Sequence, residues 1–122
     1  MIEFQPPIPV FRIFDVAKAK EFYIDYLGFE IEWEHRFEES LPLYMQIRRS
    51  GFVLHLSEHY GDGSPGAVVY ARMTGLREYH AKLKAKNYNY LRPGINEDAP
   101  GEARELAVID PFGNRIRFAE RK

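Results

Sequence analysis

The sequence predicts an α+β domain built from two βαβββ modules with curved mixed sheets. Segments with strand and helix patterns follow one another in the same order in both halves, with a period of about 60 residues. A glycine-rich stretch, 59–66, separates the halves. The chain has 122 residues, 45% of them apolar, which suits one compact domain. We therefore expect a single domain over 1–122, with module one at about 1–60 and module two at about 66–122.

The first half opens on an apolar run, 7–14, which we interpret as a strand whose prolines place its start at an edge. Asp15 stands where a helix N-cap is expected, and apolar residues at helical spacing follow it. Gly28 then ends the predicted helix. These features predict the first strand and helix of module one.

The next segment, 29–35, alternates strictly between apolar or aromatic residues and glutamates. It predicts a half-buried strand with Trp33 on the apolar face and the glutamates on the other. Two further strands are expected at 41–47 and 52–58, joined by a hairpin at Ser50-Gly51. They complete the first module.

The second half repeats this order, with Thr74 as the candidate helix cap. Its closing hairpin turns through DPFGN, in which Pro111 and Gly113 supply the turn geometry. We expect, in order, a strand at 67–73, a helix at 75–87, a short strand at 88–91, a polar loop at 93–102 and hairpin strands at 104–110 and 114–118.

The composition narrows the possible functions. A formal net charge of −1 gives no general electrostatic signature of nucleic-acid binding. The chain has no cysteine, which rules out disulfides, thiolate metal sites and a thiol nucleophile. No apolar run approaches the roughly 18–20 residues of a membrane span, and the first residues lack the pattern of a secretory signal. A soluble cytoplasmic protein, with neither nucleic acid nor membrane as a partner, is the expectation.

Two stretches, IPVFRIFDVAKAKEFYIDYLGFE (8–30) and RELAVIDPFGNRIRF (104–118), together resemble the vicinal oxygen chelate superfamily. This superfamily contains glyoxalases, extradiol dioxygenases and bleomycin resistance proteins. The resemblance covers nearly the whole chain and is greatest to the bleomycin resistance group. It implies the glyoxalase/bleomycin resistance fold, in which each module forms half of a cup with its helix outside.

The resemblance also assigns positions to the cup. Metal-dependent members place His, Gln or Glu at four inward positions, which match Ile8, His55, Val68 (or Ala67) and Arg117 here. Only His55 could bind a metal, whereas a catalytic site commonly supplies about three protein ligands. We therefore expect no metal, no other cofactor and no catalytic residue.

The expected ligand-binding residues combine aromatic and cationic side chains. An acid-rich rim around 30–40 would suit a cationic ligand, as in bleomycin binders, or be a solvated strand face. The predicted interior, with Arg12, Arg115 and two further arginines, suits an anionic or carbonyl-rich ligand better. The candidates are Trp33, Phe37, His55, Tyr70, Arg72 and Arg117.

These features favour a protein that binds and sequesters a small molecule, such as a bleomycin-type antibiotic or related ligand. The alternatives are a metal-dependent glyoxalase-type lyase or dioxygenase with a non-standard site, and a structural or regulatory subunit. The resemblance also implies a homodimer with the ligand cup at its interface. The prolines of QPPIPVF further suggest exchange of the N-terminal strand, or else protection of an exposed edge.

Overall fold

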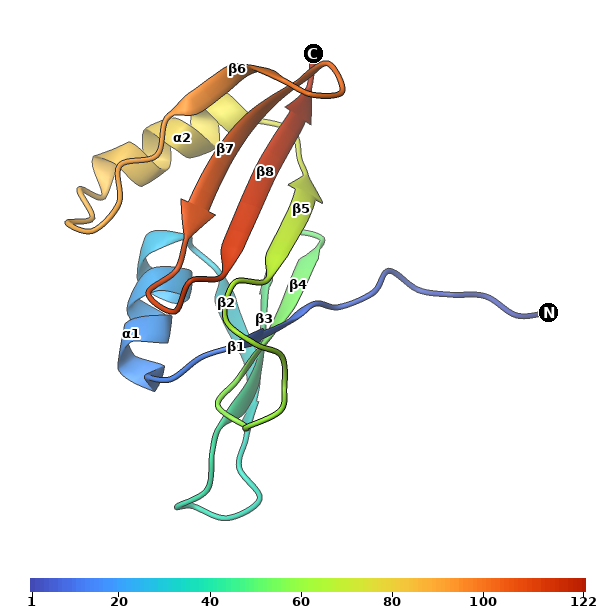
Figure 1. Cartoon of the computed structure of the whole chain (residues 1–122), viewed down its shortest axis with the longest axis vertical. Coiled ribbons are helices and arrows are strands. Elements are labelled where there is room, and N and C mark those ends of the chain that lie inside the picture. Colours follow the sequence, from blue (N-terminus) through green and yellow to red (C-terminus); the bar gives the residue numbers. More distant parts are fainter.

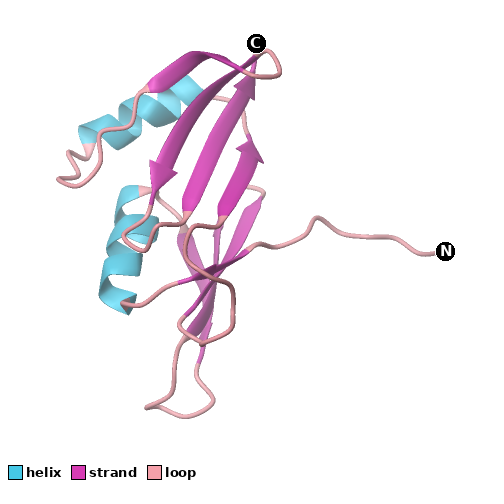
Figure 2. Cartoon of the chain, in the orientation of Figure 1, coloured by secondary structure: helices cyan, strands magenta, loops and turns pink.

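The computed structural model describes all 122 residues and confirms the α+β fold of two βαβββ modules (Figures 1 and 2). Each module contributes one four-stranded mixed sheet, and neither sheet closes into a barrel. The first module contains β1 (Val10–Arg12), α1 (Val16–Lys20), η1 (Glu21–Tyr26), β2 (Glu30–His35), β3 (Tyr44–Arg49) and β4 (Phe52–Ser57). The second contains β5 (Val68–Arg72), α2 (Leu76–Ala85), β6 (Ile95–Ala99), β7 (Ala103–Ile109) and β8 (Arg115–Arg121).

The two sheets have the same topology, with strand orders β1-β4-β3-β2 and β5-β8-β7-β6. In each, the strand before the helix pairs in parallel with the last strand of its module, and the other pairs are antiparallel. Both helices lie on the left in Figure 1, so each sheet has one face toward the helices and one face without a helix. We call the latter the open face.

Alternation along the strands separates the core from the open faces. Leu54 and Leu56 of β4, like Ile116 and Phe118 of β8, are buried on the helix side. His55 and Arg117 therefore project from the open faces, in the register that the sequence predicts. Neither helix has the length and apolar composition that a membrane-spanning helix requires.

The first helix begins and ends where the sequence predicts. Asp15 caps it, since the Oδ1 atom accepts a 3.0 Å hydrogen bond from the Lys18 amide, a contact typically worth about 1 kcal/mol. The helix continues as the π-helical η1, and Gly28 follows it with φ of 82°. A Cβ atom at Gly28 would overlap the Arg49 guanidinium, which donates to the Leu27 and Gly28 carbonyls. Glycine is thus required here for both backbone conformation and space.

The structure corrects the prediction for β2. The strand is exposed along its whole length, and its pairing with β3 shifts register between Ile31 and Trp33. This β-bulge breaks the strict alternation, so that both Glu32 and Trp33 lie over the open face. Glu34 instead forms an ion pair with Lys20 on the helix side.

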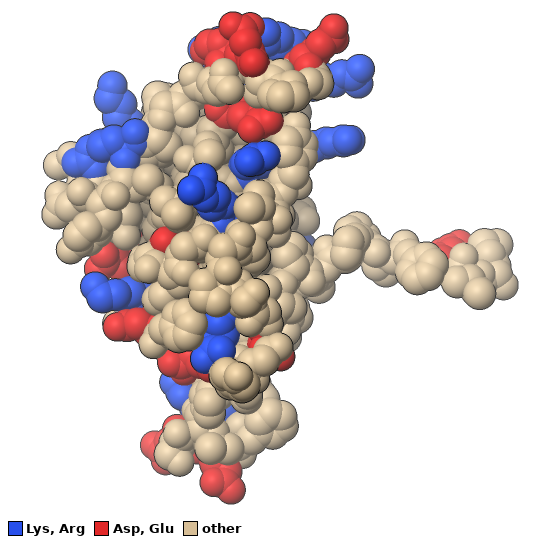
Figure 3. Space-filling model, in the orientation of Figure 1, with Lys and Arg blue, Asp and Glu red and all other residues tan.

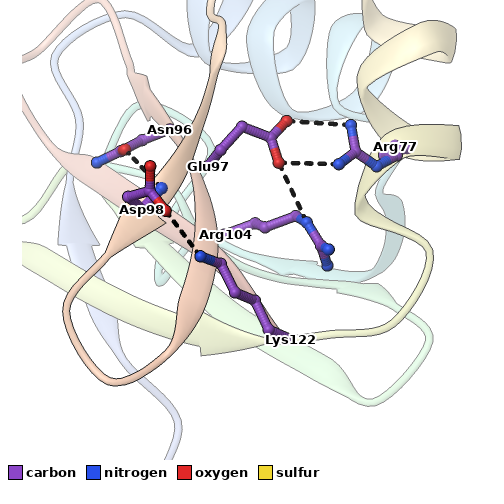
Figure 4. A network of polar contacts seen from close by, with 6 residues as sticks. All are labelled: Arg77, Asn96, Glu97, Asp98, Arg104 and Lys122. Carbon is purple, nitrogen blue, oxygen red and sulfur yellow. Dashed lines mark hydrogen bonds and ion pairs between the residues drawn. The ribbon is translucent and has the colours of Figure 1, made fainter.

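Two elements of the second module also differ from the prediction. Gly75, rather than Thr74, is the N-cap of α2, and its amide hydrogen bonds to Glu120. The strand expected at 88–91 is a turn, whereas β6 forms within the predicted loop. Figure 4 shows one reason for this strand: Glu97 of β6 binds Arg77 of α2 and Arg104 of β7. Such polar strands carry no apolar alternation to predict them.

The DPFGN turn of the second module (110–114) is hydrogen bonded to the first module. The buried Asp110 carboxylate accepts a 2.7 Å hydrogen bond from the Tyr23 hydroxyl of η1. It also accepts from the Phe112 and Asn114 amides and from the Asn114 side chain. Asn114 in turn donates to the Arg12 carbonyl of β1 at 2.9 Å. We call Tyr23, Asp110 and Asn114 the module clasp.

The buried tyrosines make the fold sensitive to alkali. Burial raises the pKa of Tyr23, reinforced by the Asp110 carboxylate, and burial also raises the pKa of Tyr79. The unfolded chain loses these protons near pH 10, before the folded chain does. Their contribution is therefore complete below about pH 10 and is lost as the pH rises above that value, by up to about 1.4 kcal/mol per pH unit for each group.

Urea unfolding between pH 8 and 11 measures this effect. The free energy of unfolding should fall above about pH 10, and Tyr23→Phe should reduce the steepness of that fall. Tyr60→Phe is the control, because Tyr60 is 96% exposed. A flat profile in the wild-type chain would contradict the prediction.

Candidate functional site

The open face of the first sheet carries a cluster of aromatic rings. Trp33 of β2 lies nearly parallel to Tyr44 of β3, with ring centroids 6.0 Å apart and planes at 13°. The Trp33 and Tyr44 rings both meet the His55 ring of β4 edge-on, at 5.4 and 5.0 Å. Because Trp33 is 42% exposed, the cluster offers accessible aromatic surface for a ligand.

Phe37 extends this cluster at the end of β2. Its ring meets those of His35 and His59 edge-on, at 4.7 and 6.0 Å. The His59 ring is also 6.3 Å from Tyr44. Phe37 is 73% exposed, so it lies at the rim of the surface that Trp33 and Tyr44 form. We call Trp33, Phe37, Tyr44 and His55 the aromatic face.

Hydrogen bonds fix the tautomer of His55. Gln46 donates its amide N–H to Glu32 at 2.9 Å, so its Oε1 atom must accept the 2.8 Å bond from His55 Nε2. The neutral imidazole then carries its proton on Nε2, and Nδ1 accepts from the Tyr44 hydroxyl at 2.6 Å. Burial lowers the pKa of His55 and so favours this neutral form.

The hydrogen bonds of His55 help to decide whether this site could bind a divalent metal. Both ring nitrogens of His55 already have partners, and the other positions matched to metal ligands hold Ile8, Val68 and Arg117. No group of three or more His, Cys, Asp or Glu side chains is placed to hold a metal ion. A guanidinium also repels a cation. The donor set therefore does not fit the divalent metal of metal-dependent members.

The open face of the second sheet is cationic and apolar. Tyr70 of β5 is in register with Arg117 of β8, and Arg72 lies two residues beyond Tyr70 on the same face. Tyr70 is 49% exposed, and both arginines are exposed. Arg115 lies two residues before Arg117. We call Tyr70, Arg72, Arg115 and Arg117 the arginine face.

A groove of about 1010 Å³ runs beside the arginine face. Its lining includes Tyr70 and Arg72 of β5, and Pro6, Pro7 and Pro9 of the N-terminal segment. The free edge of β5 borders this groove, because β5 pairs only with β8. Charges of both signs are spread over the molecular surface seen in Figure 3.

The predicted site residues thus form two groups. Trp33, Phe37 and His55 belong to the aromatic face, and Tyr70, Arg72 and Arg117 to the arginine face. No hydrogen bond, ion pair or aromatic contact joins the two groups within one chain.

The sequence analysis missed Gln46, which hydrogen bonds to His55, and Glu32, which orients the Gln46 amide. Gln46 is the register partner of His55, and Glu32 reaches Gln46 only because of the bulge in β2. The hairpin signal at Ser50-Gly51 could have placed Gln46 opposite His55, since turn length sets strand register. Nothing in the local pattern indicates the bulge.

Solved structures share this fold at low sequence identity. A bleomycin-binding protein complexed with bleomycin is 19% identical, with a TM-score of 0.66 over 98% of this chain and 100% of that chain. TnmS3, an antibiotic binding protein from Streptomyces sp. CB03234, is 19% identical, with a TM-score of 0.71 over 99% and 100%. A glyoxalase-related enzyme from Clostridium phytofermentans is 19% identical, with a TM-score of 0.75 over 99% and 98%.

The search of curated proteins gives no match. The family model described as glyoxalase superfamily protein matches residues 1–122. That match spans every element of both modules and agrees with the fold of the solved structures. The chain belongs to the glyoxalase superfamily.

Proposed function

We propose that this chain binds and sequesters a small molecule, a bleomycin-type antibiotic or a related ligand, without chemistry on it. The observation that carries the proposal is the state of His55. Its imidazole is held by Tyr44 and Gln46 within an exposed aromatic surface. Sequestration requires contact area and affinity but no bond-making, and stacking surfaces supply such affinity. The antibiotic-binding structures with this fold support the same proposal.

The test is a thermal shift of the purified chain against bleomycin and a panel of small aromatic acids, amides and amines. A ligand that binds only the folded chain raises its melting temperature, by an amount that grows with concentration above Kd. We expect at least one compound to do so. Trp33→Ala should weaken that binding by roughly tenfold or more, because stacking on an aromatic ring is typically worth about 0.5–1.5 kcal/mol beyond its buried area.

Tyr60→Ala is the matched control, because Tyr60 is 96% exposed and its ring forms no aromatic pair with the aromatic face. Its melting-temperature shift should equal that of the wild-type chain. If no compound in the panel shifts the melting temperature, the binding proposal fails. Equal losses in the Trp33 and Tyr60 variants would place the site elsewhere.

The alternative of a metal-dependent lyase or dioxygenase makes a different prediction. Such an enzyme would take up zinc, nickel or iron in a ratio of one per chain, and chelator would lower its melting temperature. The His55 hydrogen bonds and the arginine at position 117 favour sequestration instead. Metal content after incubation with each ion, measured with and without His55→Ala, separates the two functions.

We also propose that the chain works in the cytoplasm as a homodimer with the ligand cup at its interface. A self-complementary interface with twofold symmetry is the commonest arrangement for two identical chains. Such an interface would bring the aromatic face of each chain toward the arginine face of its partner, so that the dimer would contain two equivalent cups. The segment that we propose is exchanged is the exposed N-terminal arm, residues 1–5.

A further inference from the structure

The arginines of this chain divide into two groups by their contacts. Six of the eleven arginines hydrogen bond or form ion pairs within the chain. The other five have no polar partner, and alternation places all of them on the open faces of the sheets. Those five are Arg12, Arg72, Arg115, Arg117 and Arg121.

Four of the five lie on the second sheet, and two of these, Arg115 and Arg117, are adjacent on the open face of β8. Arg115 lies between Val68 and Ile109 on the neighbouring strands, and Arg117 lies between Tyr70 and Ala107. Neighbouring strands are about 4.8 Å apart, and residues two apart on one strand are separated by roughly 6.6 Å. Both guanidinium groups can therefore reach one carboxylate or phosphate group placed above the sheet.

The neighbours of these arginines are apolar and accessible. Val68, Tyr70 and Ile109 are 50%, 49% and 40% exposed. Glu105, an acid on this face, is in register with Ala119, in the same row as Arg72, and it takes part in none of the ion pairs of the chain. The face thus presents unneutralised positive charge beside exposed apolar surface.

We propose that the arginine face binds a planar aromatic carboxylate. The carboxylate would accept hydrogen bonds from Arg115 and Arg117, and the ring would pack on Tyr70, Val68 and Ile109. The groove beside β5, which Tyr70 and Arg72 also line, accommodates a larger ring system. This inference rests on the proposed small-molecule binding and deepens it, because it names the chemical class of the ligand and the residues that would bind it.

The experiment measures three probes of equal size by titration calorimetry: 2-naphthoate, the neutral 2-naphthamide and the cationic 2-naphthylmethylamine. We expect 2-naphthoate to bind at least about tenfold more tightly than either of the others, since charge-assisted hydrogen bonds contribute most of the difference. Its affinity should fall as salt is added. Acetate, which lacks a ring, should bind far more weakly.

Variants locate the binding site. Arg117→Gln should raise the Kd for 2-naphthoate by about 10- to 100-fold, and Arg117→Lys by less, because lysine keeps the charge but loses the two-pronged geometry. Arg121→Gln is the matched control. It removes the same charge from the same strand and face, roughly 13 Å away, from a residue with no partner to lose. Its Kd should stay within twofold of the wild-type value.

Several outcomes would overturn the inference. Equal affinity for all three probes, or an unchanged Kd in Arg117→Gln, would remove the anion site while leaving small-molecule binding in place. If no probe binds and Arg117→Gln lowers the molecular mass in solution, the arginine face is an interface between chains. If no probe binds but bleomycin shifts the melting temperature, the inference fails and the proposed function stands.

Discussion

Replacing Asp110 by alanine is expected to lower the free energy of unfolding by roughly 3–5 kcal/mol, because it leaves buried donors without an acceptor. The carboxylate is 5% exposed and accepts four hydrogen bonds of 2.7–2.9 Å. One comes from Tyr23 in the first module, so the loss also removes a hydrogen bond between the modules. A domain of this size is stable by only about 5–15 kcal/mol, which makes this a large fraction.

Urea unfolding of three variants tests this prediction. Tyr23→Phe removes one donor while the carboxylate keeps three, so it should cost about 1–2 kcal/mol. Asp98→Ala is the matched control, because Asp98 pairs with Lys122 at the surface with its side chain 90% exposed. Its effect should stay within about 0.5 kcal/mol. If Asp110→Ala costs no more than Asp98→Ala, the module clasp does not stabilise the fold.

The module clasp could be predicted from the sequence only in part. The turn in DPFGN follows from Pro111 and Gly113, and the structure has a turn there. Nothing in the local sequence indicates that Asp110 is buried, since its hydroxyl partner, Tyr23, lies 87 residues earlier. Contacts of this range depend on the packing of two modules rather than on periodicity.

The same distinction applies to the candidate site. Alternation correctly predicts that His55 and Arg117 project from the open faces, because their neighbours are strongly apolar and must be buried. It fails at β2, where a bulge brings Glu32 and Trp33 to one face. It fails again at β6, whose polar residues are held by ion pairs with Arg77 and Arg104. The facing of the β2 residues therefore depends on strand register, and the formation of β6 depends on ion pairs, and periodicity predicts neither of them.

Removing residues 1–5, the N-terminal arm, is expected to raise the dissociation constant of the proposed homodimer by at least about a hundredfold. In Figures 1 and 3 the arm projects away from the body of the chain. Met1, Ile2 and Phe4 are 110%, 87% and 94% exposed, so they bury almost nothing against their own module. Burying Ile2 and Phe4 on a partner would contribute about 1.5–3 kcal/mol for each side chain.

The deletion leaves the rest of the N-terminal segment intact. Pro9 accepts a 3.0 Å hydrogen bond from the His55 amide, and Pro6 and Pro7 line the groove beside β5. Stopping at residue 5 avoids these contacts, whereas a deletion of 1–9 would remove them and destabilise β4. Ile2→Ser with Phe4→Ser is the second variant, because it keeps the backbone of the arm and removes only its apolar side chains. Glu3→Gln is the control.

Light scattering over a dilution series measures the molecular mass in solution and hence the dissociation constant of the dimer. The full chain should have twice the 14.3 kDa mass of one chain, and both arm variants should approach the single-chain mass. A full chain at 14.3 kDa would contradict the dimer. Dimers of unchanged affinity in both variants would mean that the arm is not exchanged, although the chains still associate.

Ligand binding by the same variants tests whether the ligand cup requires both chains of the dimer. Within one chain, no hydrogen bond, ion pair or aromatic contact joins Trp33 and His55 to Tyr70 and Arg117. If the cup lies between two chains, a monomeric arm variant keeps each face but not both walls. It should then bind a bleomycin-sized ligand at least about tenfold more weakly, because roughly half of the contact area is lost. A small probe such as 2-naphthoate, held by the arginine face alone, should bind the monomer as tightly as it binds the dimer.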